Sequence, residues 1–447
     1  MRISTSQIYG TGVLGIERNQ NELLKLQNQM ASGRRMLTPA DDPIAAAKAL
    51  TVAQSREVVA QYARNQGDAS GRLGLVDSQL SALTDVLQSV RERVVQAGNT
   101  VLADSDRQAI ASELEVRLEE MLGIANGRSA EGDYLFSGYQ GNTQPFARSP
   151  AAAPPGTLSV SYSGDDGERL LQVGASRQMA VNVTGSDLFM NVRAGNGIFS
   201  TAASGNAGSP NQGSGVIEAG SVVDQQQWYN ALNIAFLWQG SSNRELQIVF
   251  SSVGGVSHYQ IFDASTPPAP VAALPPRAVG PELPFTPGQA IPLVTTVPPP
   301  LPAVDFGAEV VINGAPAAGD TFTITPSTNK SVFETMQDLI DVLRAPIGSP
   351  AARTAFSGQL AGHLTNLDQA MANVSRVHSS VGARMQELDA LSSNAAAVDI
   401  QYQQTLSDLQ DLDYVKAISD FTRQQVSLEA AQKSFVQISG LSLFNYI

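Results

Sequence analysis

The chain of 447 residues contains no cysteine, so neither a disulfide framework nor thiol chemistry is possible. Its three histidines, His258, His363 and His378, are scattered singly. No run of eighteen apolar residues occurs, so we expect no transmembrane helix. Positive charge is scarce, because 28 lysines and arginines stand against 41 aspartates and glutamates, and the net charge of −13 argues against nucleic acid and anionic membranes as main partners. Residues 1–6 lack the apolar core of a secretory signal, which favours a cytoplasmic protein or one exported without a cleaved signal.

Sequence motifs for catalysis are missing as well, since we find no phosphate-binding glycine loop, dinucleotide fingerprint or nucleophile elbow. Asp41 and Asp42 could be paired carboxylates for acid–base chemistry, but a capped loop explains them better. Residues 165–168 are more typical of a hairpin turn than of a calcium site, because the ligand spacing differs from that of an EF-hand. His378 occupies a heptad core position, where a buried polar residue fixes register. We therefore predict no enzyme activity, no cofactor and no metal.

What the sequence does contain is helical periodicity at both ends. Near the C-terminus, one seam at alternating spacings of three and four comprises Tyr414, Ala417, Phe421, Gln424, Leu428, Ala431, Phe435 and Ile438. Four apolar residues fall on another face, namely Val415, Ile418, Val426 and Val436. The N-terminus repeats the rhythm through Tyr9, Val13, Ile16, Gln20, Leu23, Gln27 and Met30. We predict that the two ends pair, and that a C-terminal helix apolar on two faces needs neighbours on both sides.

Other helices are marked by their ends. Gly33 is suited to end the first helix, and Asp42 followed by Pro43 is typical of a helix start. From there to about Ala97 the sequence predicts one long helix, and a shorter one follows over residues 105–125. The long helix has the seam Leu73, Val76, Leu80, Leu83, Leu87, Val90 and Val94.

The middle of the chain favours β-structure. Residues 131–138 read as a strand, and six further β-type runs lie at 159–162, 170–173, 179–183, 246–250, 310–312 and 321–324. Thirteen prolines lie between Pro267 and Pro302, which predicts an extended, solvent-facing connection. Trp228 and Trp238 are expected in the core of this region.

Helical patterns return at Ser331, which can cap a helix together with Glu334. A long helix from about Ala352 has the seam Leu364, Leu367, Met371, Val374, His378, Val381, Met385 and Leu388. The phase of the pattern slips between Leu391 and Leu412, which indicates a bend or a domain junction.

These patterns predict an α+β multidomain fold, in which both chain ends form a long, coiled-coil-like helical bundle with an inserted, mainly β domain. We expect three domains. They are paired terminal helices in 1–43 and 400–447, a helical rod in 44–142 and 331–399, and a β-rich outer domain in 143–330.

Several short stretches resemble the bacterial flagellin superfamily. They are Gln29–Arg35, Leu37–Pro43, Gly132–Gly138, Gly319–Phe322 and Gly440–Ile447. The resemblance covers both helical ends strongly and the β middle loosely. Pro43 after the paired aspartates, and the C-terminal ending, are similar to members that join hook to filament rather than to flagellin proper.

The resemblance implies a structural adaptor at the hook–filament junction that assembles through its paired terminal helices. It implies as partners further copies of the chain in a ring or short helical layer, the first hook-associated protein, flagellin, and a cytoplasmic export chaperone on the C-terminal helix. It also implies type III export without a cleaved signal, and so an extracellular place in the flagellum. Two alternatives stay open: a flagellin or minor filament subunit, and an unrelated coiled-coil adhesin or an enzyme carried by the β domain.

The candidate functional residues follow from the seams and from the resemblance. For the assembly interface we predict Tyr9, Val13, Ile16, Leu23, Met30, Tyr414, Phe421, Leu428, Phe435, Ile438, Leu441 and Phe444. The family signature loop comprises Arg34, Arg35, Thr38, Pro39, Asp41, Asp42 and Pro43.

Overall fold

The structure, a computed structural model, describes residues 5–99, 102–150, 158–205, 210–234, 238, 244–265, 276–295 and 303–444. It divides the chain into two compact units that each combine segments distant in sequence. The first unit comprises Met1–Asp68, Gln172–Gln178 and Glu387–Ile447, and the second comprises Ala69–Leu171 and Met179–Gln386. The fold is α+β, with long helices at both ends of the sequence and a mainly β region in the middle, as predicted.

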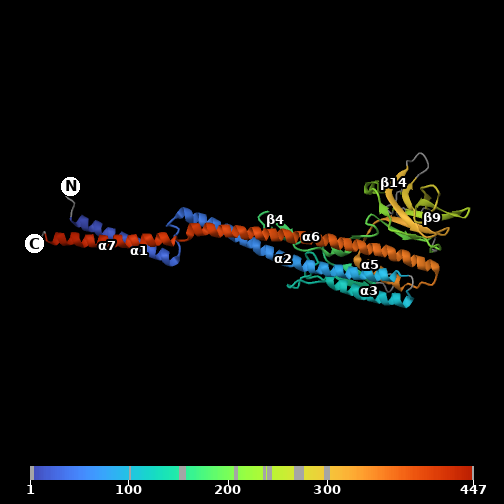
Figure 1. The fold of residues 1–447 in the computed structure, drawn as a ribbon, viewed down its shortest axis with the longest axis horizontal. Helices are drawn as coiled ribbons and strands as arrows, with labels where there is room; N and C mark the ends of the chain where they lie inside the picture. Colours follow the sequence, from blue (N-terminus) through green and yellow to red (C-terminus); the bar gives the residue numbers. More distant parts are fainter. Residues whose placement is uncertain are drawn as a thin grey trace. The chain divides into compact units, whose positions relative to one another are not determined.

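Long helices carry most of the chain (Figure 1). In the described residues the α-helices, long and short, are α1 (Thr5–Ser32), α2 (Pro43–Ala97), α3 (Asp104–Ala125), α4 (Gln225–Leu232), α5 (Val332–Arg344), α6 (Pro350–Gln410) and α7 (Tyr414–Phe444). Ser331 accepts hydrogen bonds from the first turn of α5, and Glu334 completes the capping box, as the sequence predicted.

The helical part of the second unit is held together by the α2 seam. All seven predicted seam residues, from Leu73 to Val94, are at most 1% exposed. On α6, every second position of the predicted seam is buried, including Leu367, Val374 and Val381. The alternate positions, Met371 and His378 among them, are only half-buried, so the heptad core position expected for His378 is wrong. Ala370 and Val377, at 1% and 3% exposure, complete the buried face instead.

The strands form short antiparallel sheets. They are β1 (Phe146–Pro150), β2 (Leu158–Tyr162), β3 (Leu170–Gly174), β4 (Arg177–Ala180), β5 (Val192–Arg193), β6 (Phe199–Ala203), β7 (Val216–Ile217), β8 (Ser221–Val222), β9 (Leu246–Val253), β10 (Val256–Asp263), β11 (Arg277–Ala278), β12 (Leu283–Pro284), β13 (Ala290–Thr295), β14 (Val304–Asn313), β15 (Thr321–Pro326) and β16 (Asn329–Lys330). One sheet has the order β11-β10-β9-β15-β6 with β12 beside β10, and a second has β13-β14-β7 with β8 beside β14. β1 with β2, β3 with β4, and β5 with β16 form separate pairs.

The two larger sheets share one hydrophobic core, which extends from Phe199 to Ile324. Trp228 on α4 packs on Phe306, with ring centroids 5.6 Å apart, and Trp238 meets the same ring at 5.8 Å. Both tryptophans are buried, as predicted. A different aromatic cluster lies against α5, where Phe333 stacks on Phe189 at 5.4 Å. The β-region therefore packs around two centres, and the three-domain division remains a prediction.

Three local predictions for the middle of the chain are wrong. Residues 131–138 form turns rather than a strand, because Gly132 and Gly138 have φ of 92° and 69°. Residues 165–168 are not a hairpin turn, since β2 before them pairs with β1 and β3 after them pairs with β4. The described part of the proline-rich segment contains β11, β12 and β13, with Ile291 and Leu293 buried. Prolines are accommodated because β13 is an edge strand; residues 266–275 and 296–302 lie outside the described residues.

Candidate assembly site

Helices α1 and α7 lie side by side in the first unit (Figure 1). Along α1, the residues withdrawn from solvent at alternating spacings of three and four are Tyr9, Gly12, Ile16, Asn19, Leu23, Leu26 and Met30. Along α7 they are Ala417, Phe421, Gln424, Leu428, Ala431 and Phe435. Only Ala417 is buried and the rest are half-buried, because two helices alone cannot enclose a core.

Phe435 marks the best-defined contact of this pair. A Cβ atom at Gly12 would lie 2.8 Å from the Phe435 ring, so the missing side chain leaves room for that ring. Tyr9 meets the same ring edge-on, with centroids 5.9 Å apart and planes at 82°. Further along, the Gln424 side-chain amide donates to Asn19 Oδ1 at 3.0 Å.

The predicted pairing face of α1 is wrong at every second position. Val13 is 43% exposed, because the face passes through Gly12 instead, and Gln20 and Gln27 likewise lie beside the face. A search for the smallest residue opposite each large ring would have found Gly12. On α7, Tyr414 is 50% exposed, although its hydroxyl donates to the Met30 carbonyl at 3.2 Å. Ile438, Leu441 and Phe444 lie outside the side chains that the structure describes, so their role stays a prediction.

The second apolar face of α7 is open to solvent. Val415 is 80% exposed, Val436 67%, Val426 61% and Ile418 51%. Single exposed apolar side chains are ordinary, but a row of them along one helix marks an interaction surface. We call these four residues the outer face of α7.

The signature loop between α1 and α2 is built by two aspartates. Asp41 accepts hydrogen bonds from the backbone N–H groups of Leu37 and Thr38, at 3.0 and 2.8 Å, and pairs with Lys25 Nζ at 2.8 Å. Asp42 accepts from the N–H of Ala45 at 3.0 Å and so caps α2. The capped-loop interpretation of the two carboxylates is therefore confirmed, with Pro43 as the first residue of α2 and Pro39 exposed in the loop.

These contacts keep both carboxylates ionised. The hydrogen bond from Lys25, together with that from the Thr38 backbone, holds the pKa of Asp41 well below its ordinary value. The hydrogen bond from the Ala45 N–H, followed by that from Arg35, lowers the pKa of Asp42. The loop is therefore built around two negative charges at neutral pH.

A joint connects this loop with the break between α6 and α7. Gly33, at φ 69°, ends α1, and its carbonyl accepts from the N–H of Leu412 at 2.9 Å. The N–H of Arg35 donates to the Gln410 carbonyl at 2.8 Å, and its guanidinium donates to the Leu409 carbonyl at 2.9 Å. Arg34 forms an isolated antiparallel bridge with Asp411. The joint thus satisfies carbonyls at the end of α6 that lack partners within the helix.

Arg35 is itself held in place by its neighbours. Its second guanidinium nitrogen lies 3.2 Å from Asp42, the residue that caps α2. The side chain of Gln29, which is only 9% exposed, donates to the Arg35 carbonyl. The sequence placed Arg35 in the signature loop but gave no sign that it caps a helix 374 residues away.

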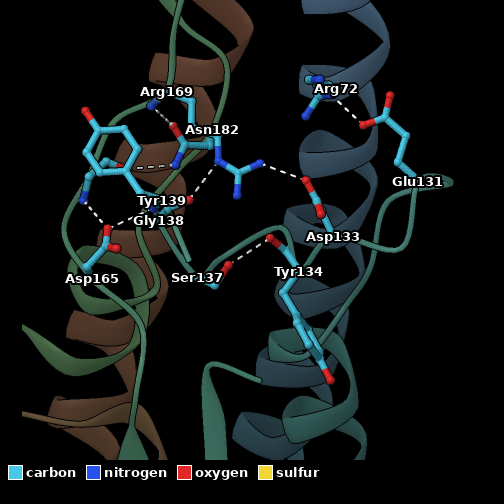
Figure 2. A network of polar contacts seen from close by, with 11 residues as sticks. Arg72, Glu131, Asp133, Tyr134, Ser137, Gly138, Tyr139, Asp165, Arg169 and Asn182 are labelled. Atoms are coloured by element: carbon cyan, nitrogen blue, oxygen red, sulfur yellow. Dashed lines mark hydrogen bonds and ion pairs between the residues drawn. The ribbon is translucent and has the colours of Figure 1, made fainter. Parts of the chain in front are cut away.

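A second structured loop lies in the second unit, and the sequence gave no sign of the hydrogen bonds that hold it (Figure 2). Arg169 donates to Asp133 at 3.0 Å and to the Gly138 carbonyl at 2.9 Å. Asp165 accepts from the backbone N–H groups of Tyr139 and Gly167, both at 2.8 Å, which lowers its pKa. These bonds fix the loop that the resemblance singled out at 132–138.

The described residues give no support to a catalytic arrangement. His378 is not a core residue, because its ring is 36% exposed and its Nε2 lies 2.8 Å from Asp77. Asp41 and Asp42 are each engaged by their own partners, and the residues that the structure describes contain no cluster of three or more metal-binding side chains. Within the same residues, no helix is long and apolar enough to cross a lipid bilayer.

Family comparisons agree with the pairing of the two ends. The bacterial flagellin N-terminal helical region matches residues 3–141, and the C-terminal helical region matches residues 364–447. The chain thus carries the N-terminal and C-terminal helical regions of bacterial flagellin. Flagellar hook-associated protein 3 of Salmonella typhimurium is 34% identical over 192 residues, which are 43% of this chain and 58% of that protein. The match thus spans less than two thirds of this relative.

Two solved structures of family members are similar over a larger share of the chain. Flagellar hook-associated protein-3 from Legionella pneumophila is 27% identical, with a TM-score of 0.66 over 80% of this chain and 98% of that one. The flagellar junction protein FlgL from the same organism is 28% identical, with a TM-score of 0.64 over 81% and 100%. The chain is thus similar over about four fifths of its length to proteins named for the flagellar hook and its junction.

Proposed function

We propose that the chain forms the junction between the flagellar hook and filament. The observation that carries this proposal is the similarity to a junction protein over four fifths of the chain and the whole of that protein. Asp41 and Asp42 serve this structural role by holding the loop between α1 and α2 and the start of α2.

The terminal helices supply the assembly surface. The α1–α7 contact leaves the outer face of α7 exposed, so further copies of the chain can cover it in a ring or short helical layer. Full burial of a valine or isoleucine contributes roughly 1.5–3 kcal/mol, and these side chains are already partly covered, so each adds about 1–2 kcal/mol to assembly. The free energies of burial from several copies would add up around the layer.

The layer has two ends and therefore two kinds of neighbour. The first hook-associated protein lies on one side and flagellin on the other. Before export without a cleaved signal, a cytoplasmic chaperone covers the C-terminal helix, because an exposed apolar face favours aggregation.

A deletion strain tests the proposal. Cells that lack the chain should carry hooks without filaments and shed flagellin into the medium, and the wild-type gene should restore filaments. Val426→Asp should fail to restore them, because it places a charge on the outer face, whereas Ser427→Asp at an exposed neighbour should succeed. Normal filaments in the deletion strain would contradict the proposal.

The alternative role as a flagellin or minor filament subunit predicts different behaviour in vitro. Purified flagellin seeded with filament fragments should extend them indefinitely, whereas a junction subunit should stop after a short layer. Electron microscopy of seeded mixtures distinguishes the two.

A further inference from the structure

The break between α6 and α7 has no cause in its local sequence. α6 ends at Gln410 and α7 begins at Tyr414, yet the chain contains neither glycine nor proline between Gly382 and Gly440. Asp413 caps α7 by accepting from the Lys416 N–H at 3.1 Å, but an aspartate inside a helix is tolerated at small cost. Local sequence therefore permits the break without requiring it.

The contacts that hold the break open come from the N-terminal loop. Inside a helix the Leu412 N–H would donate to the carbonyl four residues earlier, but here it donates to Gly33. Arg35 occupies the carbonyls of Leu409 and Gln410, which a continuing helix would use for its own N–H groups. Docking of residues 33–35 thus competes directly with helix continuation.

The break also changes which face of α7 meets α1. At the end of α6, the residues withdrawn from solvent at alternating spacings of three and four are Leu388, Leu391, Ala395, Val398, Tyr402, Thr405 and Leu409. Continued without interruption, this series would pass through 412, 416, 419, 423 and 426. The face that meets α1 runs instead through Ala417, Phe421, Gln424 and Leu428. Residue 426 of the continued series thus lies two positions after Gln424 and two before Leu428. At about 100° per residue, a two-residue offset rotates the face by roughly 200°.

We infer that Arg35 is a positioning residue that imposes the α6–α7 break and thereby sets the face that α7 presents to α1. Without the docked loop, α6 and α7 continue as one helix, and Val426 replaces Gln424 on the side facing α1. The inference concerns the chain's own geometry and stands apart from the junction role proposed above.

Cross-linking in the full-length chain tests this, because the natural sequence has no cysteine that would interfere. Two double-cysteine variants are compared, Asn19→Cys with Gln424→Cys and Asn19→Cys with Val426→Cys. A short bis-maleimide is added at 4 °C, and the yield is measured by mass spectrometry. With Arg35 present, the 19/424 pair should cross-link more than the 19/426 pair, since Asn19 and Gln424 are in contact.

Arg35→Pro should reverse the order of the two yields, because proline removes both the guanidinium that donates to Leu409 and the N–H that donates to Gln410, whereas alanine would keep the N–H. Arg34→Ala is the control, because it removes the same charge one residue earlier and should leave the order unchanged. Unchanged yields in Arg35→Pro, or an equal fall of both pairs, would overturn the inference, since the loop would then stabilise the helix pair without setting its phase.

A proline provides a second, independent arm. Val415 lies in the first turn of α7, where proline is tolerated, whereas within a continuous helix its ring would clash with the carbonyl of residue 411. Val415→Pro added to Arg35→Pro should therefore restore the original order of yields. Failure of this rescue would also count against the inference.

Discussion

Leu83 lies at the centre of the α2 seam and is fully buried in the second unit. Leu→Ala at such a site loses both the transferred methyl groups and the packing around the cavity, which costs about 2–5 kcal/mol. At roughly 2–4 °C per kcal/mol for a large unit, Leu83→Ala should lower the main thermal midpoint by about 4–20 °C. Differential scanning calorimetry of the full chain measures this directly.

The same substitution elsewhere supplies matched controls. Leu428 is half-buried between two helices, so Leu428→Ala should affect only a separate, lower transition of the α1–α7 pair. Leu14 is 53% exposed, and Leu14→Ala should change neither transition. Equal shifts of the main midpoint in Leu83→Ala and Leu428→Ala would refute the reasoning, because the terminal pair would then unfold together with the bundle.

Three further predictions concern other parts of the chain. Gly12→Val should destabilise the α1–α7 pair, because the new side chain would collide with the Phe435 ring, whereas Gly15→Val has open space at its Cβ and should destabilise the pair less. The midpoint of the lower calorimetric transition measures both effects. The folded-state pKa of Asp41 is lowered, so its stabilising contribution is present above its unfolded pKa of about 4 and is lost as the pH falls below that value. The midpoint of the lower transition should therefore fall progressively as the pH is lowered from about 5 toward the folded-state pKa, and less so in Asp41→Asn. Replacing residues 195–327 by a short turn between β5 and β16 should leave helical circular dichroism and the main transition intact, because the core from Phe199 to Ile324 is removed as a whole.

Strong local signals predicted much of the fold from the sequence. The α2 seam, the capped start at Asp42 and the capping box at Ser331 all depend on spacings within a few turns of one helix, and all three are present. The α1 face was misplaced because Val13 is apolar and Gly12 is not. Hydrophobicity alone places Val13 on the pairing face. In the structure Gly12 lies there, because the Phe435 ring of α7 needs the space that a side chain at residue 12 would fill.

The break between α6 and α7 shows where local reasoning ends. A change of phase before the terminal seam is visible in the sequence, because it is a property of consecutive side chains. The structure places this change after Leu409, since the series from Leu388 to Leu409 keeps one phase. Its cause is not visible in the sequence, because the Gly33 carbonyl and the N–H and guanidinium of Arg35, which occupy the broken end, belong to a loop hundreds of residues away. Only the pairing of the chain ends reveals which loop holds the helix open. The periodicity predicted that the two chain ends pair, but it could not predict the position of the α6–α7 break. The pairing itself fixes that position.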